Sequence, residues 1–196
     1  CSRKKCVCTH KKRVIMNIER PIYLQRLINR KHNGMIKIVT GMRRSGKSYL
    51  LNNLFTNHLL SAGVAPDHII SIDLEDIINK PLREPMAIIS YIYQSTKDNQ
   101  YHYLIIDEIQ LLSEFEEVLN TLLKKQIYDV YVTGSNARFL SKDVITTFRG
   151  RGDEVRVHPL NFAEYFSAQP SSPLIEPILN DYLRLGGLPQ MVTMQD

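Results

Sequence analysis

Cysteine is absent from the sequence after residue 8, where Cys1, Cys6 and Cys8 are followed by 188 residues without a thiol. A disulfide framework is therefore excluded for the body of the chain, and we expect a hydrophobic core to stabilise it instead. This distribution fits a reducing, cytoplasmic setting better than a secreted one. A zinc site among these cysteines is disfavoured, because the stretch lacks a CxxC pair and a fourth ligand at the usual spacing.

Long apolar runs are also missing. No run reaches the roughly 18 residues that a membrane helix requires, and no apolar signal-peptide segment follows the basic start of the chain. We therefore expect no membrane partner. The sequence has 196 residues, of which 43% are hydrophobic, which is enough for one domain with a core and the beginning of a second.

The excess of positive charge is confined to the start of the chain. The formal net charge is +5, but six basic residues lie in a stretch without acids: Arg3, Lys4, Lys5, Lys11, Lys12 and Arg13. The rest of the sequence is nearly neutral, so the charge does not indicate a nucleic-acid face on the folded part. We expect residues 1–15 to be a disordered basic extension and the folded part to begin at Met16.

Apolar strand patterns alternate with helical patterns along the chain. Strands are predicted at residues 35–40, 68–74, 101–107, 128–134 and 153–160, and helices at 20–34, 48–63, 85–96, 161–166 and 177–185, with a helical turn at 141–148. Ser113 and Glu116 form a predicted capping box before a further amphipathic helix. Residues 169–173 form a Pro/Ser linker. Alternating strands and helices indicate an α/β fold with a parallel sheet.

The stretch GMRRSGKS fits the P-loop pattern G-x-x-x-x-G-K-[ST] between a strand and a helix. Glycines let the backbone wrap around phosphates, and the start of the helix adds amide groups and a positive dipole end. Lys47 is expected to reach the β- and γ-phosphates, and Ser48 to ligate Mg²⁺. The predicted ATP-binding segment is Gly41, Met42, Arg43, Arg44, Ser45, Gly46, Lys47, Ser48 and Tyr49. The alternative is a glycine turn with exposed cations.

Two acidic residues follow the apolar strand in YLIIDEIQ. Asp107 is expected to complete the Mg²⁺ shell with Ser48, and Glu108 to polarise the attacking water. The alternative is that the pair only ends a strand in solvent. The pair follows the P-loop by about sixty residues, which favours the catalytic interpretation.

Further candidates follow the fourth predicted strand. Thr133, Ser135 and Asn136 should lie at the same edge of the sheet as the P-loop, where a polar side chain can bind the γ-phosphate or the water. Ser135 or Asn136 could equally be the N-cap of the next helix. Arg149 and Arg151 lie between glycines, and either could complete a neighbour's active site or be an ordinary surface cation.

With these motifs, the chain resembles AAA-type ATPases of a large prokaryotic group known only as ATP-binding proteins. The shared segments are TGMRRSGKSYLL, LIIDEIQ, VTGSNARFL, RGRGDEVRVHPLNFAEYF and YLRLGGLPQMV. The resemblance implies a three-layer P-loop fold with a five-stranded parallel sheet, and ATP with Mg²⁺ as ligands. It also implies Ser135 or Asn136 as the polar sensor, and Arg151 as an arginine finger acting within a homo-oligomer.

Members of this group usually continue into a lid and a C-terminal domain. We expect residues 16–168 to form the ATP-binding domain and 169–196 a linker and the start of a truncated lid, so that a protein or DNA partner would bind a missing C-terminal domain. The expected function is slow Mg²⁺-dependent ATP hydrolysis that drives a conformational change in an attached or partner domain. Two alternatives remain, a non-hydrolysing nucleotide-dependent scaffold or DNA-associated switch and a nucleoside kinase of the thymidine-kinase type. The kinase would need zinc-binding cysteines in its body, which the sequence lacks.

Overall fold

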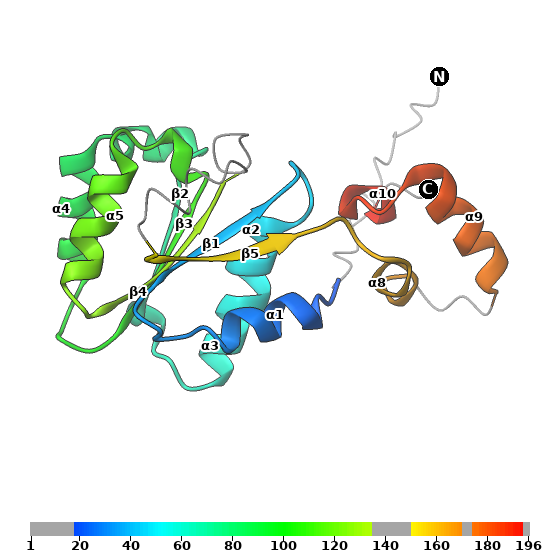
Figure 1. Cartoon of the computed structure of the whole chain (residues 1–196), viewed down its shortest axis with the longest axis horizontal. Helices are drawn as coiled ribbons and strands as arrows, with labels where there is room; N and C mark the ends of the chain where they lie inside the picture. Colours follow the sequence, from blue (N-terminus) through cyan, green and yellow to red (C-terminus); the bar gives the residue numbers. More distant parts are fainter. Residues whose placement is uncertain (1–17, 135–149, 170–173, 194–196) are drawn as a thin grey trace, which may run out of the picture.

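The computed structural model describes residues 18–134, 150–169 and 174–193 and contains a five-stranded parallel sheet (Figure 1). The strands are β1 (Ile36–Gly41), β2 (Ile69–Asp73), β3 (His102–Asp107), β4 (Tyr128–Thr133) and β5 (Gly152–Val157). They are ordered β2-β3-β4-β1-β5, and each neighbouring pair is parallel. The predicted α/β fold with a five-stranded parallel sheet is confirmed.

The central strands are apolar along their length because both faces of the sheet are covered. Every residue of β1, β3 and β4 is buried. Successive side chains in a strand point to opposite faces. In β3, Leu104 and Ile106 therefore belong to one core, whereas Tyr103 and Ile105 belong to the other.

Helices form a layer on each face of the sheet (Figure 1). On one face, α4 (Pro85–Ser95) and α5 (Phe115–Lys124) pack against each other and on the first core. On the other face, α1 (Pro21–Ile28) packs against the helix that follows the P-loop. The sheet is thus the middle layer of three.

The helix predicted over residues 48–63 is present but has three parts. It begins as α2 (Lys47–Tyr49), continues as a π-helical segment (Leu50–Phe55) and ends as α3 (Thr56–Ser61). Its fully buried side chains are Leu50, Leu51, Phe55 and Leu59. Each such burial contributes about 1.5–3 kcal/mol. Among all helices in the described ranges, none is both long and apolar enough to cross a membrane.

The capping box predicted at Ser113 and Glu116 is wrong. Helix α5 is preceded by Glu114 at φ 48°, and no side chain caps it. The backbone amide of Ser113 instead donates to the carbonyl oxygen of Arg83 at 3.0 Å, which turns the chain before the helix begins. A capping box does form at Asn161 and Glu164, where each side chain accepts the backbone N–H of the other residue.

Two predicted boundaries also shift. The helix expected over 20–34 ends at Ile28. Tighter turns follow, in which the amides of Arg30 and Lys31 donate to the carbonyl oxygens three residues before them. His32 then takes φ 57°, and its amide donates to Asp129 at 3.2 Å. The strand expected over 153–160 ends at Val157, two residues before Pro159, which has no N–H for a ladder. Short 3₁₀ helices connect other elements at Pro66–His68, Ile77–Arg83 and Ile109–Leu111.

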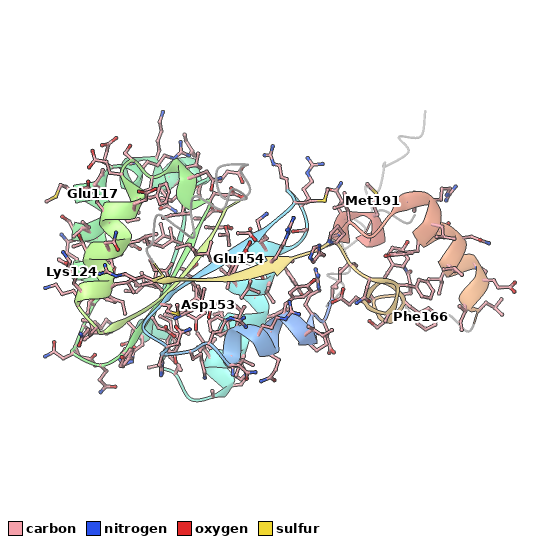
Figure 2. The ribbon with its side chains drawn as sticks, in the orientation of Figure 1. Glu117, Lys124, Asp153, Glu154, Phe166 and Met191 are labelled. Atoms are coloured by element: carbon pink, nitrogen blue, oxygen red, sulfur yellow. The ribbon has the colours of Figure 1, made fainter. Side chains whose placement is uncertain are left out.

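The last helices gather at one end of the molecule, beyond the carboxyl end of β5 (Figure 1). They are α8 (Phe162–Ser167), α9 (Ile175–Leu185) and α10 (Pro189–Thr193). Figure 2 labels Phe166 on α8 and Met191 on α10 at this end. A small core joins α8 and α9 to the start of the described chain through Ile18, Leu160, Tyr165, Ala168 and Ile178. The predicted domain boundary after residue 168 stays a prediction.

Candidate nucleotide-binding site

The candidate residues meet at the carboxyl edge of the sheet. The P-loop follows β1, Asp107 ends β3, and Thr133 ends β4, which lies between those two strands. Because all three strands are parallel, their last residues lie along one edge, where open α/β sheets bind ligands. The fold therefore brings the P-loop, the acidic pair and Thr133 together, as the sequence predicts.

Both motif glycines of the P-loop are required by the backbone. A Cβ atom at Gly41 would lie 2.1 Å from the carbonyl oxygen of Val157, so only glycine fits between β1 and β5. Gly46 has φ 93° and immediately precedes α2, a conformation that glycine adopts without strain. Arg44 also lies in the left-handed region at φ 64°, which costs about 1–3 kcal/mol for a residue with a side chain. The loop is thus held in a strained, defined shape.

Lys47 is buried inside this loop, with 4% of its surface exposed. Its Nζ donates hydrogen bonds to the carbonyl oxygens of Gly41 at 3.2 Å and Met42 at 3.0 Å. Burial lowers the pKa of the Lys47 ammonium, while the negative charges of Glu108 and Asp107 act to raise it. The loop therefore holds a desolvated cation in the field of the acidic pair.

Thr133 ties the acidic pair to the next strand. Its hydroxyl donates to Oδ1 of Asp107, whose side chain is buried. The backbone N–H of Glu108 donates to Oγ1 of Thr133 at 3.0 Å and to Oδ1 of Asp107 at 3.2 Å. These contacts fix the carboxylate of Asp107 at the edge of the sheet.

Glu108 leaves the line of the strand. Its φ of 52° ends β3 at Asp107 and begins the 3₁₀ helix that follows. Nε2 of Gln110 donates to Oε2 of Glu108, so the carboxylate of the proposed base already accepts a hydrogen bond from its own loop. The sequence showed both residues but gave no signal of this contact.

The other predicted ATP-binding residues differ in exposure. Met42, Arg43, Arg44 and Ser48 are exposed, and Arg43 makes a surface ion pair with Glu75 at 3.4 Å. Ser45 is buried, and its Oγ has no hydrogen-bond partner among the described residues. Tyr49 packs against the core of the C-terminal helices rather than toward solvent. The ammonium of Lys47 and the backbone carbonyl groups that it binds thus lie inside the loop, whereas the side chains of Arg43 and Arg44 are exposed on its outer side.

Some candidates do not join this cluster. Ser135, Asn136 and Arg149 lie outside the described residues, as does the helical turn expected at 141–148. Arg151 precedes β5 at the amino edge of the sheet, opposite the P-loop, where it is exposed and donates to Asn120 at 3.2 Å. An arginine finger acts on the phosphates of a neighbouring subunit, and the structure contains a single chain. The role of Arg151 as an arginine finger therefore stays a prediction.

Arg20 is a residue at the site that sequence reasoning missed. Its buried guanidinium donates to the carbonyl oxygens of Ser45 at 3.1 Å and His158 at 2.7 Å, and to Glu164 at 3.0 Å. It also lies over the ring of Tyr23, 4.5 Å from the centroid. Arg20 therefore links the P-loop to the end of β5 and to α8. These partners are distant in sequence, so no local pattern identified it.

The C-terminal segment also reaches the P-loop. A Cβ atom at Gly46 would lie 3.5 Å from Cγ of Pro189, the first residue of α10. The segment is anchored by Gly187, whose carbonyl oxygen accepts from the N–H of Leu160 at 2.6 Å. The P-loop is therefore in contact with elements that belong to the predicted lid.

The side chains at this edge suit a magnesium nucleotide. Mg²⁺ prefers oxygen ligands, and the carboxylate of Asp107 and the hydroxyl of Ser48 are of that kind. The ammonium of Lys47 and the amides at the start of α2 suit the negative charge of phosphates. The donor set therefore fits both parts of the ligand.

Comparisons with known proteins agree with this arrangement. A model of the AAA domain family matches residues 33–166. An uncharacterised protein of Haemophilus influenzae is 32% identical over 179 residues, which cover 89% of this chain and 44% of that protein. One of Methanocaldococcus jannaschii is 30% identical over 175 residues, covering 82% of this chain and 37% of that protein. The chain thus spans less than half the length of these relatives.

Solved structures share the fold. A Walker-type ATPase of Pyrococcus abyssi matches with a TM-score of 0.59 at 18% identity, over 90% of this chain and 66% of that one. The Aeropyrum pernix ORC1 protein in complex with DNA matches with a TM-score of 0.58 at 12% identity, over 90% of this chain and 58% of that one. AMPPCP-bound DnaA from Aquifex aeolicus matches with a TM-score of 0.54 at 15% identity, over 86% of this chain and 56% of that one. At these identities the likeness concerns the fold alone.

Proposed function

The chain belongs to the AAA domain family of P-loop ATPases, and from this premise we propose that it binds ATP with Mg²⁺ and hydrolyses it slowly. The turnover would change the conformation of an attached or partner domain. The observation that carries the proposal is the buried ammonium of Lys47, held in the P-loop and in the field of Asp107 and Glu108. A buried cation in this position is costly unless an anion joins it.

The P-loop would bind the phosphates of ATP. The backbone amides at the start of α2 would donate to phosphate oxygens, and the positive end of the helix dipole favours the negative charge of the phosphates. Lys47 already bends over the loop to bind the carbonyl oxygens of Gly41 and Met42. A phosphate oxygen would compete for the same ammonium protons, so Lys47 would exchange a neutral partner for a charged one.

Asp107 and Ser48 would hold Mg²⁺, which neutralises phosphate charge when bound. Thr133 keeps the carboxylate of Asp107 at the edge of the sheet. Glu108 would orient the attacking water and accept its proton. The hydrogen bond from Gln110 must break before both lone pairs of Oε2 can accept from water, which is consistent with slow turnover.

Arg20 and Pro189 would transmit the state of the P-loop to the C-terminal helices. Arg20 bonds Ser45 in the loop and Glu164 in α8, and Pro189 of α10 lies beside Gly46. A shift of the loop around phosphates would move these contacts directly. We propose that residues 16–168 form the ATP-binding domain and that residues 169–196 begin the lid, with a protein or DNA partner bound elsewhere in a longer protein.

A non-hydrolysing switch is the second candidate, and the contact between Gln110 and Glu108 favours it. A carboxylate held in this way can still sense the γ-phosphate without activating water. We propose DNA as one partner of such a switch, since DNA is what the similarly folded ORC1 protein of Aeropyrum pernix binds. Arg151 would then serve only in contacts between subunits.

ATP calorimetry and single-turnover cleavage test the two candidates. Lys47→Ala should abolish ATP binding, and unchanged affinity would refute the proposed site. Glu108→Gln should keep binding but lower cleavage by roughly 10²–10⁴-fold, the usual contribution of a general base. If wild type and Glu108→Gln both bind ATP but cleave it only at the background rate, the ATPase proposal is wrong and the non-hydrolysing switch is favoured.

A further inference from the structure

A group of metal-ligating side chains lies at the opposite edge of the sheet from the P-loop. His68 ends a 3₁₀ helix just before β2, Asp98 lies between α4 and β3, and His102 begins β3. The register pairs Ile69 with Tyr103, which puts the two histidines side by side at the amino ends of neighbouring strands. Their ring centroids are 4.6 Å apart.

The spacing of the ligand atoms suits a transition metal. One nitrogen from each histidine and one oxygen of Asp98 all lie within 4.8 Å of one another. Nε2 of His68 lies 3.2 Å from Oδ2 of Asp98. In a tetrahedral zinc site with bonds of about 2.0–2.1 Å, two ligand atoms lie roughly 3.3 Å apart. The pair therefore already has the separation of two ligands on one ion.

The backbone of Gln100 orients two of the three side chains. Its N–H donates to Oδ1 of Asp98 at 2.9 Å, which leaves Oδ2 directed at His68. Its carbonyl oxygen lies 2.9 Å from Nδ1 of His102. A carbonyl only accepts, so Nδ1 of His102 carries the proton and Nε2 presents its lone pair. Ligating histidines are typically fixed in this way by a carbonyl behind the ring.

The lone pair on Nε2 of His102 is not explained by an ordinary contact between His68 and Asp98. His102 is fully buried, and its Nε2 has no hydrogen-bond partner among the described residues. A buried acceptor without a donor costs about 1–3 kcal/mol. A metal ion is a partner that a lone pair on neutral imidazole can bind.

We propose that His68, Asp98 and His102 form a binding site for a divalent transition metal of the zinc class. Two imidazoles and one carboxylate favour Zn²⁺ over Mg²⁺ or Ca²⁺, which prefer oxygen ligands alone. Three protein ligands leave one position for water. The ion would connect the starts of β2 and β3, far from the proposed ATP site, and would stabilise this edge of the sheet.

The test is a calorimetric Zn²⁺ titration of the full chain without nucleotide. Cys1, Cys6 and Cys8 are replaced by Ser and His10 by Gln, so that the N-terminal thiols and imidazole do not compete. This parent should bind one Zn²⁺ at this site. His68→Gln and Asp98→Asn, which alter partly exposed side chains and leave the buried His102 intact, should each weaken binding by at least roughly tenfold.

His58→Gln is the matched control, because it removes a histidine from α3 outside the group and should leave Zn²⁺ affinity unchanged. Co²⁺ absorption gives a second readout, since the parent should show the intense visible bands of tetrahedral coordination and His68→Gln should lose them. Zn²⁺ should also raise the melting temperature of the parent but not of His68→Gln. Absent binding, or equal affinity in the parent, His68→Gln and Asp98→Asn, would overturn the site.

Discussion

The guanidinium of Arg20 donates a hydrogen bond to the carbonyl oxygen of Ser45 across 3.1 Å, although Arg20 lies 25 residues earlier in the chain. The same group forms a buried ion pair with Glu164. Arginine presents its donors in a rigid planar fork, so one side chain can hold three partners in fixed directions. The conformation of the P-loop thus depends on a side chain outside the motif.

Arg20→Lys should therefore weaken both folding and ATP binding. Lysine keeps the charge but cannot reach Ser45, His158 and Glu164 together, so one or more buried acceptors lose their donor. We expect a loss of about 1–3 kcal/mol in the free energy of unfolding. We also expect the ATP Kd to rise by about tenfold, which corresponds to about 1.4 kcal/mol. Urea unfolding and ATP calorimetry measure these effects.

The control for Arg20→Lys is Arg26→Lys. Arg26 is exposed in α1 and also lies over the Tyr23 ring, 5.7 Å from its centroid, but among the described residues its guanidinium makes no hydrogen bond to the P-loop. Its replacement should change the free energy of unfolding by no more than about 0.5 kcal/mol and leave ATP affinity unchanged. Wild-type ATP affinity in folded Arg20→Lys would contradict the positioning role.

Gln110→Ala should raise the rate of ATP cleavage. The amide of Gln110 donates to Oε2 of Glu108, and removing this donor takes away one competitor of the attacking water for that oxygen. A hydrogen bond to a charged group is worth about 1.5–3 kcal/mol, so even partial relief permits up to roughly a tenfold rise. Single-turnover assays measure the rate, and ATP affinity should not change.

The double variant Glu108→Gln/Gln110→Ala separates this effect from a general loosening of the loop. In this double variant residue 108 no longer carries a carboxylate, so removing the Gln110 side chain cannot make a general base more available to the water. Its cleavage rate should equal that of Glu108→Gln alone. A slower rate in Gln110→Ala than in wild type would mean that Gln110 positions Glu108 for catalysis rather than restraining it.

Arg151→Ala should leave ATP affinity intact and lower turnover only at concentrations where subunits associate. Arg151 lies at the amino edge of its own sheet, exposed and bonded to Asn120, so it can act only on another subunit's phosphates. Arginine fingers contribute roughly 10³–10⁵ in rate. Sedimentation and steady-state ATPase assays over a concentration series measure both properties.

Complementation gives the decisive comparison for Arg151. Lys47→Ala subunits would still supply the finger, and Arg151→Ala subunits would still bind ATP. A mixture of the two inactive variants should regain part of the wild-type rate if the finger acts between subunits. An Arg151→Ala chain with full activity at every concentration would exclude the role.

The sheet and the P-loop could be predicted because their signals are local. The strand YLIID is apolar up to its last residue, Asp107, and GMRRSGKS determines its own turn through Gly41 and Gly46. The acidic pair could be placed beside this loop because parallel strands end at the same edge. The apolar patterns predict five strands, and the family resemblance implies the same number.

Contacts between distant segments could not be predicted in this way. Lys37 in β1 is fully buried against Asp129 in β4, and within the strand pattern it looks like an exposed cation. The capping box predicted at Ser113 is wrong, because the amide of Ser113 donates to the carbonyl oxygen of Arg83. A capping box that the sequence analysis does not predict forms at Asn161, before α8. At both Lys37 and Ser113, a tertiary partner overrides what the local pattern indicates.

Lys47→Met should stabilise the protein near neutral pH, and the gain should shrink as the pH rises. Burial lowers the pKa of Lys47 below its ordinary value of 10.5, so the charged form is disfavoured in the folded state. Between the folded-state pKa and 10.5, the unfolded chain binds the proton and the folded chain does not, so the unfolding free energy of wild type rises with pH. Lys47→Met lacks this titration, whereas the buried Lys37 titrates in both proteins and cancels from their difference. Urea unfolding of both proteins from pH 7 upward measures the gap, and a gap that widens with pH would show that burial is not the dominant influence on Lys47.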